Sequence, residues 1–179
     1  MDHLRAGWRM GQPPGYGGDG FTYADIEPEQ GKTLFESIEQ SDLPADETYI
    51  LHRSTHSFAV LNVFPYNSGH LMVLPRLAAT SIDALNQAQF VDLWEQVRQA
   101  SIAVKAALHP DGLNIGVNEG VAGGGSVPDH LHVHIVPRWR TDTNFITTAA
   151  SARVLPVSLA ETWARLRAHW PLEPVGSEL

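Results

Sequence analysis

The stretch Asp129-His-Leu-His-Val-His-Ile-Val-Pro-Arg-Trp139 determines how the rest of this chain is interpreted. Its three histidines, at positions 130, 132 and 134, alternate with leucine, valine and isoleucine, and a period of two predicts a β-strand. Residues i, i+2 and i+4 of a strand lie on one face. We therefore expect the three imidazoles on one side of the strand and the aliphatic side chains in a core on the other.

A row of three imidazoles indicates chemistry, and two kinds of chemistry fit it. Neutral imidazole is the commonest metal ligand, and it is also a nucleophile and proton-transfer group that neighbouring groups can orient. A purely structural row is disfavoured because six buried ring nitrogens would need partners. A metal site would usually add a carboxylate, but Asp129 directly precedes His130 and so points to the opposite face. We therefore predict no metal site.

The composition is that of an ordinary globular domain. The 179 residues suffice for one domain with a substantial core, and 43% are hydrophobic and 18% charged. The absence of cysteine excludes a disulfide framework and would restrict any metal site to histidines and carboxylates. The chain has no run of 18 apolar residues and no signal-peptide pattern, so we expect a cytoplasmic protein that does not enter a membrane.

The net charge of the chain and the glycine-rich loop before the histidines indicate what kind of ligand the protein binds. A net charge of −8 with only two lysines argues against nucleic-acid binding through the phosphate backbone. The loop at 119–129 contains Gly123-Gly124-Gly125-Ser126, and backbone N–H groups of such a loop can converge on one small anion. The loop therefore predicts a phosphate pocket beside the imidazoles, with a flexible connection as the alternative.

Periodicity, turn residues and caps predict an antiparallel α+β domain with five strands in hairpin-like order, one long helix and a terminal helix. Asn86 with Gln89, and Ser158 with Glu161, form candidate capping boxes for the two helices. Ser81 is expected to cap a single helical turn, and residues 41–46 to form a loop. Strands are expected at 49–51, 58–63, 70–74, 113–117 and 129–139, and helices at 31–40, 87–108 and 159–170.

Two further segments complete the expected organisation. Residues 1–32 are rich in glycine and predict an irregular arm anchored by three aromatic residues, Trp8, Tyr16 and Phe21. The long helix has an apolar stripe that we expect either on the sheet or at a subunit contact. The stripe consists of Phe90, Leu93, Trp94, Val97, Ser101, Val104 and Leu108.

The run His130-Leu-His-Val-His-Ile-Val136 resembles the signature of the histidine-triad (HIT) family. Residues 58–75, with Asn62 and His70, resemble the paired strands before the family's long helix, and residues 114–120 its penultimate strand. Residues 4–10 resemble an N-terminal segment of longer bacterial members. On this basis we expect an arm and short helix at 1–47, a HIT-like catalytic domain at 48–148 and a C-terminal extension at 149–179, packed as a single structural domain.

The resemblance also implies an activity. HIT members fold around a five-stranded antiparallel sheet, are usually homodimers, and hydrolyse or transfer nucleoside monophosphates through a nucleotidyl-histidine intermediate. By position, His132 would be the nucleophile and His134 would hydrogen-bond the phosphate oxygens. His130, backed by His70, would orient the site.

The nucleotide would be held by residues from several segments. The resemblance implies that Asn62 binds the ribose hydroxyls, with Val63 beside the base. The family positions around the phosphate correspond to Asn118, Gly125 and Ser126, with Ser126 a candidate donor to the leaving group. Trp139, just past the strand, would either stack on a base at the pocket rim or pack at the surface or an interface.

The implied substrates are dinucleoside polyphosphates such as diadenosine tetraphosphate, cleaved by phosphorolysis or hydrolysis. Many hydrolytic members carry glutamine just before the loop serine, whereas Gly125 in this chain resembles the bacterial diadenosine tetraphosphate phosphorylases. The alternatives are a nucleoside phosphoramidate hydrolase and a non-catalytic nucleotide-binding sensor. We expect no cofactor of the protein's own, although Mg2+ can accompany the nucleotide.

Overall fold

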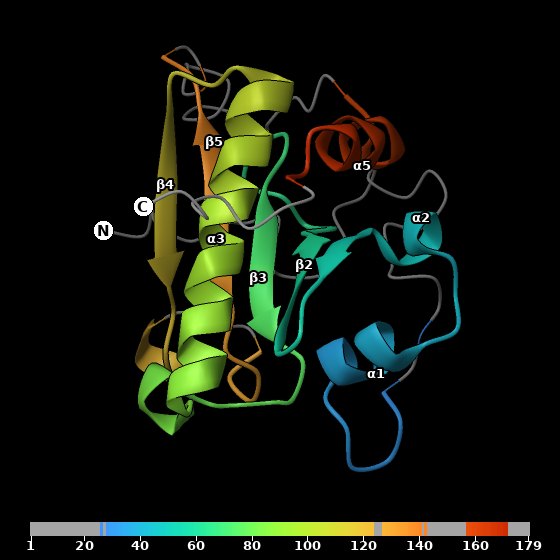
Figure 1. Ribbon diagram of the computed structural model, residues 1–179, viewed down its shortest axis with the longest axis vertical. Helices are drawn as coiled ribbons and strands as arrows, with labels where there is room; N and C mark the ends of the chain where they lie inside the picture. The colour runs from blue at the N-terminus through green and yellow to red at the C-terminus, as the bar shows by residue number, and fades with distance from the viewer. Residues whose placement is uncertain (1–25, 27, 124–126, 141, 143–156, 172–179) are drawn as a thin grey trace.

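The computed structural model describes residues 26, 28–123, 127–140, 142 and 157–171. One five-stranded antiparallel sheet, ordered β1-β2-β3-β5-β4, runs through it (Figure 1). The strands are β1 Ile50–Arg53, β2 Ser57–Leu61, β3 Leu71–Pro75, β4 Gly112–Val117 and β5 Val133–Arg138. The α+β class and the five antiparallel strands predicted from the sequence are confirmed. The expected hairpin-like order is wrong at one place, because β5 lies between β3 and β4, so that β3 pairs with β5 and the long helix separates β3 from β4 in the chain.

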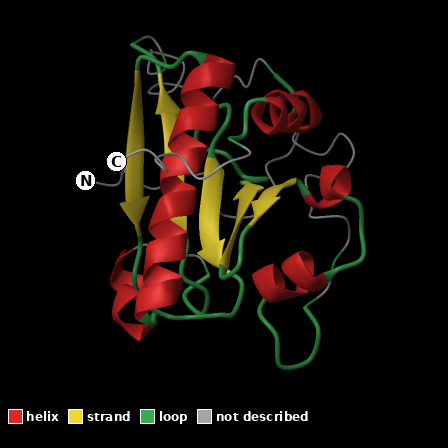
Figure 2. Cartoon of the chain, viewed as in Figure 1, coloured by secondary structure: helices red, strands yellow, loops and turns green. Residues whose placement is uncertain are grey.

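The long helix α3, Gln87–Leu108, lies across the sheet and packs on β2, β3 and β5 (Figures 1 and 2). Its predicted capping box is present, because Asn86 accepts the Gln89 backbone N–H and the Gln89 side chain accepts that of Asn86. The other helices are α1 Leu34–Gln40, α2 Ala45–Thr48, α5 Leu159–Ala168 and the 3-10 turns η3 Ile82–Ala84 and η4 Val121–Gly123.

The ends of several elements differ from the prediction. The first helix begins at Leu34 because Thr33 caps it, and part of the expected loop is the short helix α2, with Asp46 and Glu47 favourably placed in its first turn. The cap on α5 is half of the predicted box: Ser158 accepts the Glu161 backbone N–H, but the Glu161 carboxylate pairs with Arg165. Capping and charge thus decided boundaries that apolar periodicity left open.

The histidine strand is shorter than predicted. β5 begins at Val133, so only His134 of the three histidines lies within the strand. Val133 pairs with Val73 of β3 and with Val117, the last residue of β4. Before it, the Leu131 N–H donates to the Ala79 carbonyl, 2.6 Å away, which lies outside the sheet. β4 therefore ends where β5 begins, and although β3 continues to Pro75, its pairing with β5 stops at Val73.

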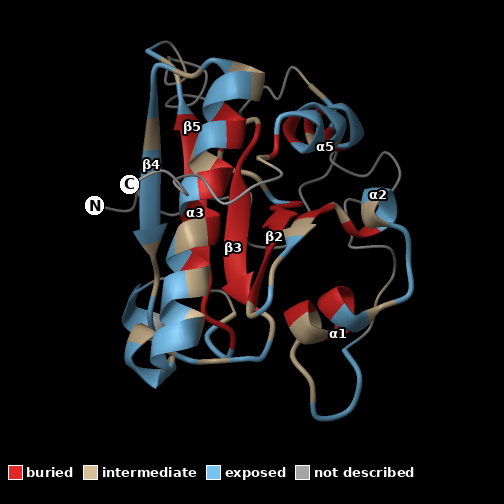
Figure 3. Ribbon diagram, viewed as in Figure 1, coloured by how far each residue is buried: buried red, intermediate tan, exposed pale blue. Residues whose placement is uncertain are grey.

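The core lies between α3 and the sheet (Figure 3). All residues of β2 and β3 are buried, whereas β4 at the sheet edge is largely exposed. From the predicted stripe of α3, Leu93, Val97 and Val104 enter the core, while Phe90 and Trp94 are 38% and 36% exposed. The stripe therefore divides into a face packed on the sheet and an apolar edge facing outward.

A glycine sets the approach of the β2–β3 turn to the rest of the fold. Gly69 has a φ of +79°, and a Cβ there would collide with the Leu108 side chain and lie 3.2 Å from Pro137 Cγ. The turn can therefore pack between the end of α3 and β5 only without a side chain. This close packing places His70 at the start of β3.

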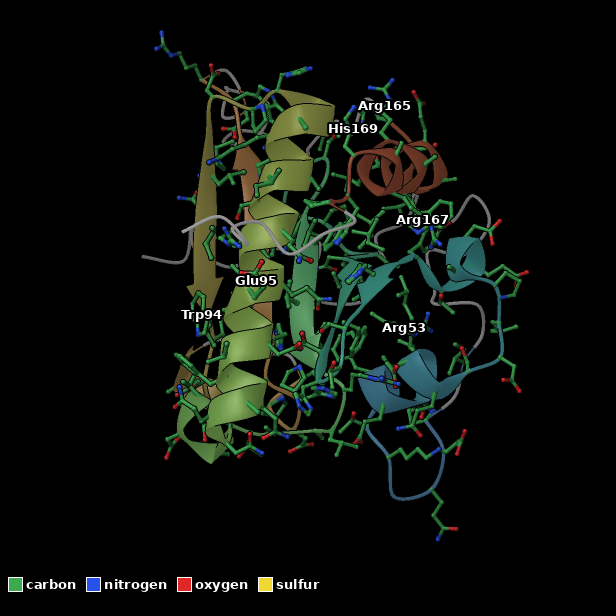
Figure 4. All side chains as sticks on the ribbon, in the orientation of Figure 1. Arg53, Trp94, Glu95, Arg165, Arg167 and His169 are labelled. Carbon is green, nitrogen blue, oxygen red and sulfur yellow. The ribbon has the colours of Figure 1, made fainter. Side chains whose placement is uncertain are left out.

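The helices at the other end of the sheet are tied to β1. The Arg53 guanidinium on β1 lies 3.1 Å from the Glu39 backbone oxygen in α1, and Figure 4 shows Arg53 reaching toward that helix. The Trp163 indole N–H of α5 donates to the Ile50 carbonyl at 3.0 Å. None of the helices in the described ranges is long and apolar enough to cross a membrane. Trp8, Tyr16 and Phe21, the expected anchors of the arm, lie outside the described residues.

Candidate active site

The ring of His132 is held in one tautomer by the backbone. Its Nδ1 lies 2.8 Å from the His130 carbonyl oxygen, which can only accept a hydrogen bond. Nδ1 must therefore carry the proton, and Nε2 keeps its lone pair. The residue is 4% exposed, so its ring is largely desolvated. This is the state required of an imidazole nucleophile.

His70 and His134 form a second pair with an assignable direction. The Tyr66 backbone N–H donates to His70 Nδ1 at 3.0 Å, so His70 carries its proton on Nε2. That Nε2 lies 3.0 Å from His134 Nδ1 and therefore donates to it. His134 is left with its own proton on Nε2, which lies 3.5 Å from the Asn118 side-chain amide. The pair thus presents an N–H donor beside His132.

His130 uses both ring nitrogens for structure. Nε2 lies 2.8 Å from the Pro75 carbonyl oxygen and so donates to it, which leaves Nδ1 to accept from the Thr33 hydroxyl at 2.7 Å. Burial lowers the pKa of His130, an effect that outweighs the opposing hydrogen bond to Pro75. We infer a neutral ring near neutral pH that anchors the segment from which His132 projects.

The histidines gather although two of them precede the strand. The ring centroids of His132 and His134 are 4.7 Å apart, and those of His70 and His134 are 5.1 Å apart. The alternating residues Leu131, Val133 and Ile135 are buried in the core, as predicted. One expectation is corrected: His70 contacts His134 and does not back His130, because the Thr33 and Pro75 oxygens occupy both nitrogens of His130.

Asn62 and Val63 lie beside the histidines, just after β2 ends at Leu61. The Asn62 side-chain nitrogen is 3.4 Å from His70 Nδ1, and its oxygen accepts the Phe64 backbone N–H at 2.9 Å. An asparagine that caps this turn explains why β2 stops before it, contrary to the predicted strand over 58–63. Asn62 and Val63 are both buried.

Trp139 is placed away from these groups. It follows Arg138, the last residue of β5, whereas His132 precedes the first. At roughly 3.3 Å per residue of strand, its distance from His134 along the chain is about 16 Å. Trp139 therefore does not lie beside the histidine rings, and its stacking on a base at the pocket rim stays a prediction. Gly125 and Ser126 lie outside the described residues.

Three residues that the sequence interpretation overlooked surround the rings. Tyr66 stacks on His70 with centroids 4.6 Å apart, and Phe35 lies 5.7 Å from His130 and 6.2 Å from His132. Thr33 contacts His130 directly. The run Thr33-Leu-Phe-Glu36 matches a capping box and could have been found, but no local signal links it to a histidine 97 positions away.

The arrangement favours transfer chemistry on an anionic centre. Within the described ranges, no group of three or more histidines, aspartates or glutamates could hold a metal ion. What these residues do provide is one ring nitrogen that is unprotonated in the neutral tautomer, Nε2 of His132, beside one imidazole N–H, on His134. A nucleophile beside a hydrogen-bond donor suits attack on a phosphoryl group.

Comparison with known proteins decides the family. The family model described as the HIT domain matches residues 44–141.

The chain belongs to the HIT family.

Its relatives within the HIT family include the AP-4-A phosphorylase of Mycobacterium tuberculosis, which is 38% identical over 132 residues, or 74% of this chain and 68% of that protein. The asymmetrical bis(5'-nucleosyl)-tetraphosphatase of Schizosaccharomyces pombe is 33% identical over 93 residues, about half of each chain. Among solved HIT structures, a hypothetical histidine triad nucleotide-binding protein from Sulfolobus tokodaii has a TM-score of 0.63 and 25% identity, covering 76% of this chain and 91% of that one.

Proposed function

We propose that this HIT protein is a nucleotidyl transferase that cleaves dinucleoside polyphosphates through a nucleotidyl-histidine intermediate on His132. The observation that carries the proposal is the 2.8 Å hydrogen bond from His132 Nδ1 to the His130 carbonyl. It fixes the proton of the neutral ring on Nδ1, so that Nε2 carries the lone pair that acts as the nucleophile. The likeness to AP-4-A phosphorylase, at 38% identity, supports this substrate class.

In the first step, His132 Nε2 attacks the α-phosphorus of the substrate. An N–P bond forms, and the bond from phosphorus to the bridging oxygen breaks. With diadenosine tetraphosphate, ATP leaves and AMP remains on the histidine. The ring becomes positively charged, and its Nδ1–H bond to the His130 carbonyl strengthens as that charge develops.

In the second step, an acceptor attacks the same phosphorus and the electron pair of the N–P bond returns to Nε2. Inorganic phosphate as acceptor yields ADP, and water yields AMP. We propose phosphate, on the likeness to AP-4-A phosphorylase and on Gly125 in place of glutamine. The imidazole leaves readily because it departs as a neutral ring.

The neighbouring residues would stabilise this transfer. His134 Nε2–H, with its tautomer set by His70, would donate to a non-bridging phosphate oxygen, and the Asn118 amide lies 3.5 Å from the same nitrogen. We propose that Asn62 binds the ribose, Val63 lies beside the base, and Gly125 and Ser126 contribute to the phosphate pocket, with Ser126 donating to the leaving group. No cofactor of the protein's own enters either step, and Mg2+ would arrive with the nucleotide.

Product analysis tests the proposal. The full chain is incubated with diadenosine tetraphosphate, with and without inorganic phosphate labelled with 18O, and the nucleotides are identified by mass spectrometry. We expect ATP and ADP, with the label in the β-phosphate of ADP. AMP and ATP in the presence of phosphate would make water the acceptor. No turnover together with tight AMP binding would indicate a sensor and contradict the proposal.

We also propose that the protein is a homodimer, joined through the outward edge of α3 and β4. β4 is the terminal strand of the sheet and has exposed backbone and side chains. Beside it lie large apolar side chains that are 36% to 55% exposed. They are Phe90, Val91, Trp94, Ile102 and Ile115, and Trp94 is labelled on α3 in Figure 4.

Replacing Trp94 with glutamate is expected to convert the dimer to a monomer, because the charge would have to be buried without a partner. Sedimentation velocity or light scattering at micromolar concentration measures the mass. Ala164→Glu, an apolar-to-acid change at another exposed position, on α5, is the control and should leave the mass unchanged. A monomeric wild-type protein would contradict the dimer, and a dimeric Trp94→Glu variant would exclude this face.

A further inference from the structure

Helix α1 lies N-terminal to the matched HIT region at 44–141, yet its first turn contacts the histidine triad. The Thr33 hydroxyl is 2.7 Å from His130 Nδ1, and the Phe35 ring meets the same imidazole edge-on at 5.7 Å. Both Phe35 and His130 are buried. The contact therefore belongs to the interior of the fold and not to a surface.

The direction of the Thr33 hydrogen bond is determined by the groups around it. His130 Nε2–H donates to the Pro75 carbonyl, so Nδ1 has only a lone pair to offer. The Thr33 hydroxyl must donate its single proton to that nitrogen. Its oxygen accepts the Glu36 backbone N–H at 3.2 Å, the N-cap bond of α1. One hydroxyl thus joins the helix cap to the imidazole.

Glu36, the other residue of the capping box, links α1 to the backbone of the histidine segment through residues 78 and 79. The Glu36 carboxylate accepts the Thr33 N–H at 2.8 Å with one oxygen and the Ala78 N–H at 3.0 Å with the other. The adjacent Ala79 carbonyl accepts the Leu131 N–H at 2.6 Å. The ring of His130 and the peptide that follows it are therefore both linked to the first turn of α1.

This linkage bears on His132 because His130 supplies the carbonyl that sets its tautomer. We propose that Thr33 is a positioning residue, whose hydroxyl fixes the ring and backbone of His130 and thereby aligns that carbonyl with His132 Nδ1. The inference deepens the proposed function and rests on it for its effect on turnover. If Thr33 has this role, the active site includes the N-terminus of α1, which lies outside the matched HIT region.

Three substitutions separate the hydroxyl's donor role from its capping role. Thr33→Val removes both at nearly constant volume, and Thr33→Ser keeps both. Thr33→Asp can still cap α1 by accepting the Glu36 N–H, but its carboxylate has no proton to give to His130. The control is Ser158→Ala, which removes the equivalent cap bond from α5.

We expect Thr33→Val and Thr33→Asp to lower kcat by about tenfold to a hundredfold, because neither side chain donates a proton to His130 Nδ1, with KM within about threefold of wild type. Thr33→Ser and Ser158→Ala should keep kcat within about twofold. If Thr33→Asp turns over like wild type, the hydroxyl proton is not needed and the proposal is overturned. If Ser158→Ala loses as much activity as Thr33→Val, the loss reflects capping alone and the proposal is also overturned.

Histidine 15N NMR of the full chain without substrate gives a readout that a simple capping role would not change. In Thr33→Val we expect the Nδ1 signals of both His130 and His132 to move, and in Thr33→Asp we expect the pKa of His130 to rise because a carboxylate favours the imidazolium. Unchanged His132 signals in folded Thr33→Val would overturn the proposal. This measurement needs no nucleotide, so it tests the role of Thr33 independently of turnover. Failure of the wild-type protein to cleave diadenosine tetraphosphate would refute the proposed function and would leave the NMR test of Thr33 intact.

Discussion

Replacing His132 with asparagine is expected to reduce turnover of diadenosine tetraphosphate by at least about 10^4-fold, in line with the loss of other enzyme nucleophiles. The amide nitrogen of asparagine has no available lone pair to attack phosphorus, so the covalent route is removed. The side chain is smaller and polar, and it can still occupy the site beside the His130 carbonyl. Nucleotide binding should therefore survive, and calorimetry with AMP should give a dissociation constant within a few-fold of wild type.

The control for this substitution is His109→Asn. His109 is exposed, ends α3 in the left-handed conformation with a φ of 48°, and asparagine is tolerated in that conformation. It should leave both turnover and stability unchanged. Base-quenched wild-type protein, digested at alkaline pH and analysed by mass spectrometry, should carry AMP on the peptide containing His132. Wild-type turnover by His132→Asn would rule out this residue as the nucleophile.

Replacing His70 with leucine is expected to lower kcat by about 10^2-fold to 10^3-fold, similar to the loss of one oxyanion donor. His70 Nε2–H holds His134 in the tautomer that places a proton on its Nε2. Without that donor, His134 can move the proton to Nδ1 and present a lone pair to the phosphate oxygens. The substitution therefore turns an attractive contact into a repulsive one, although His134 itself is unchanged.

His70→Gln provides the comparison, since its amide can donate to His134 Nδ1 and should recover part of the lost rate. Thermal unfolding of both variants separates a change in tautomer from a loss of folding, because His70 is fully buried beside Tyr66. 15N NMR should show the His134 proton on Nε2 in wild type and shared between the nitrogens in His70→Leu. A folded His70→Leu variant with nearly full activity would show that His134 does not depend on this hydrogen bond.

The side of the chain that enters the core beside the histidines was predictable, but the pairing of the histidines was not. The alternation of histidines and aliphatic residues correctly indicated that Leu131, Val133 and Ile135 enter the core. It also suggested one continuous strand, whereas β5 begins only at Val133, because β4 ends opposite that residue and the pairing with β3 stops there. The predicted support of His130 by His70 was wrong for a similar reason: partners across the sheet depend on register, which a sequence pattern does not specify.

The sequence by itself determined the α+β class, the existence of the five antiparallel strands and the long helix with its Asn86 cap, since these depend on local patterns of two, three or four residues. It did not determine the order of the strands, because β5 lies between β3 and β4. Tertiary structure alone decided that Thr33 contacts His130 and that His70 Nε2 contacts His134 Nδ1. Each of these depends on the distance between segments that only folding brings together. A donor and an acceptor form a hydrogen bond only when they lie within about 3 Å of each other, and the sequence pattern does not specify which distant residues come that close.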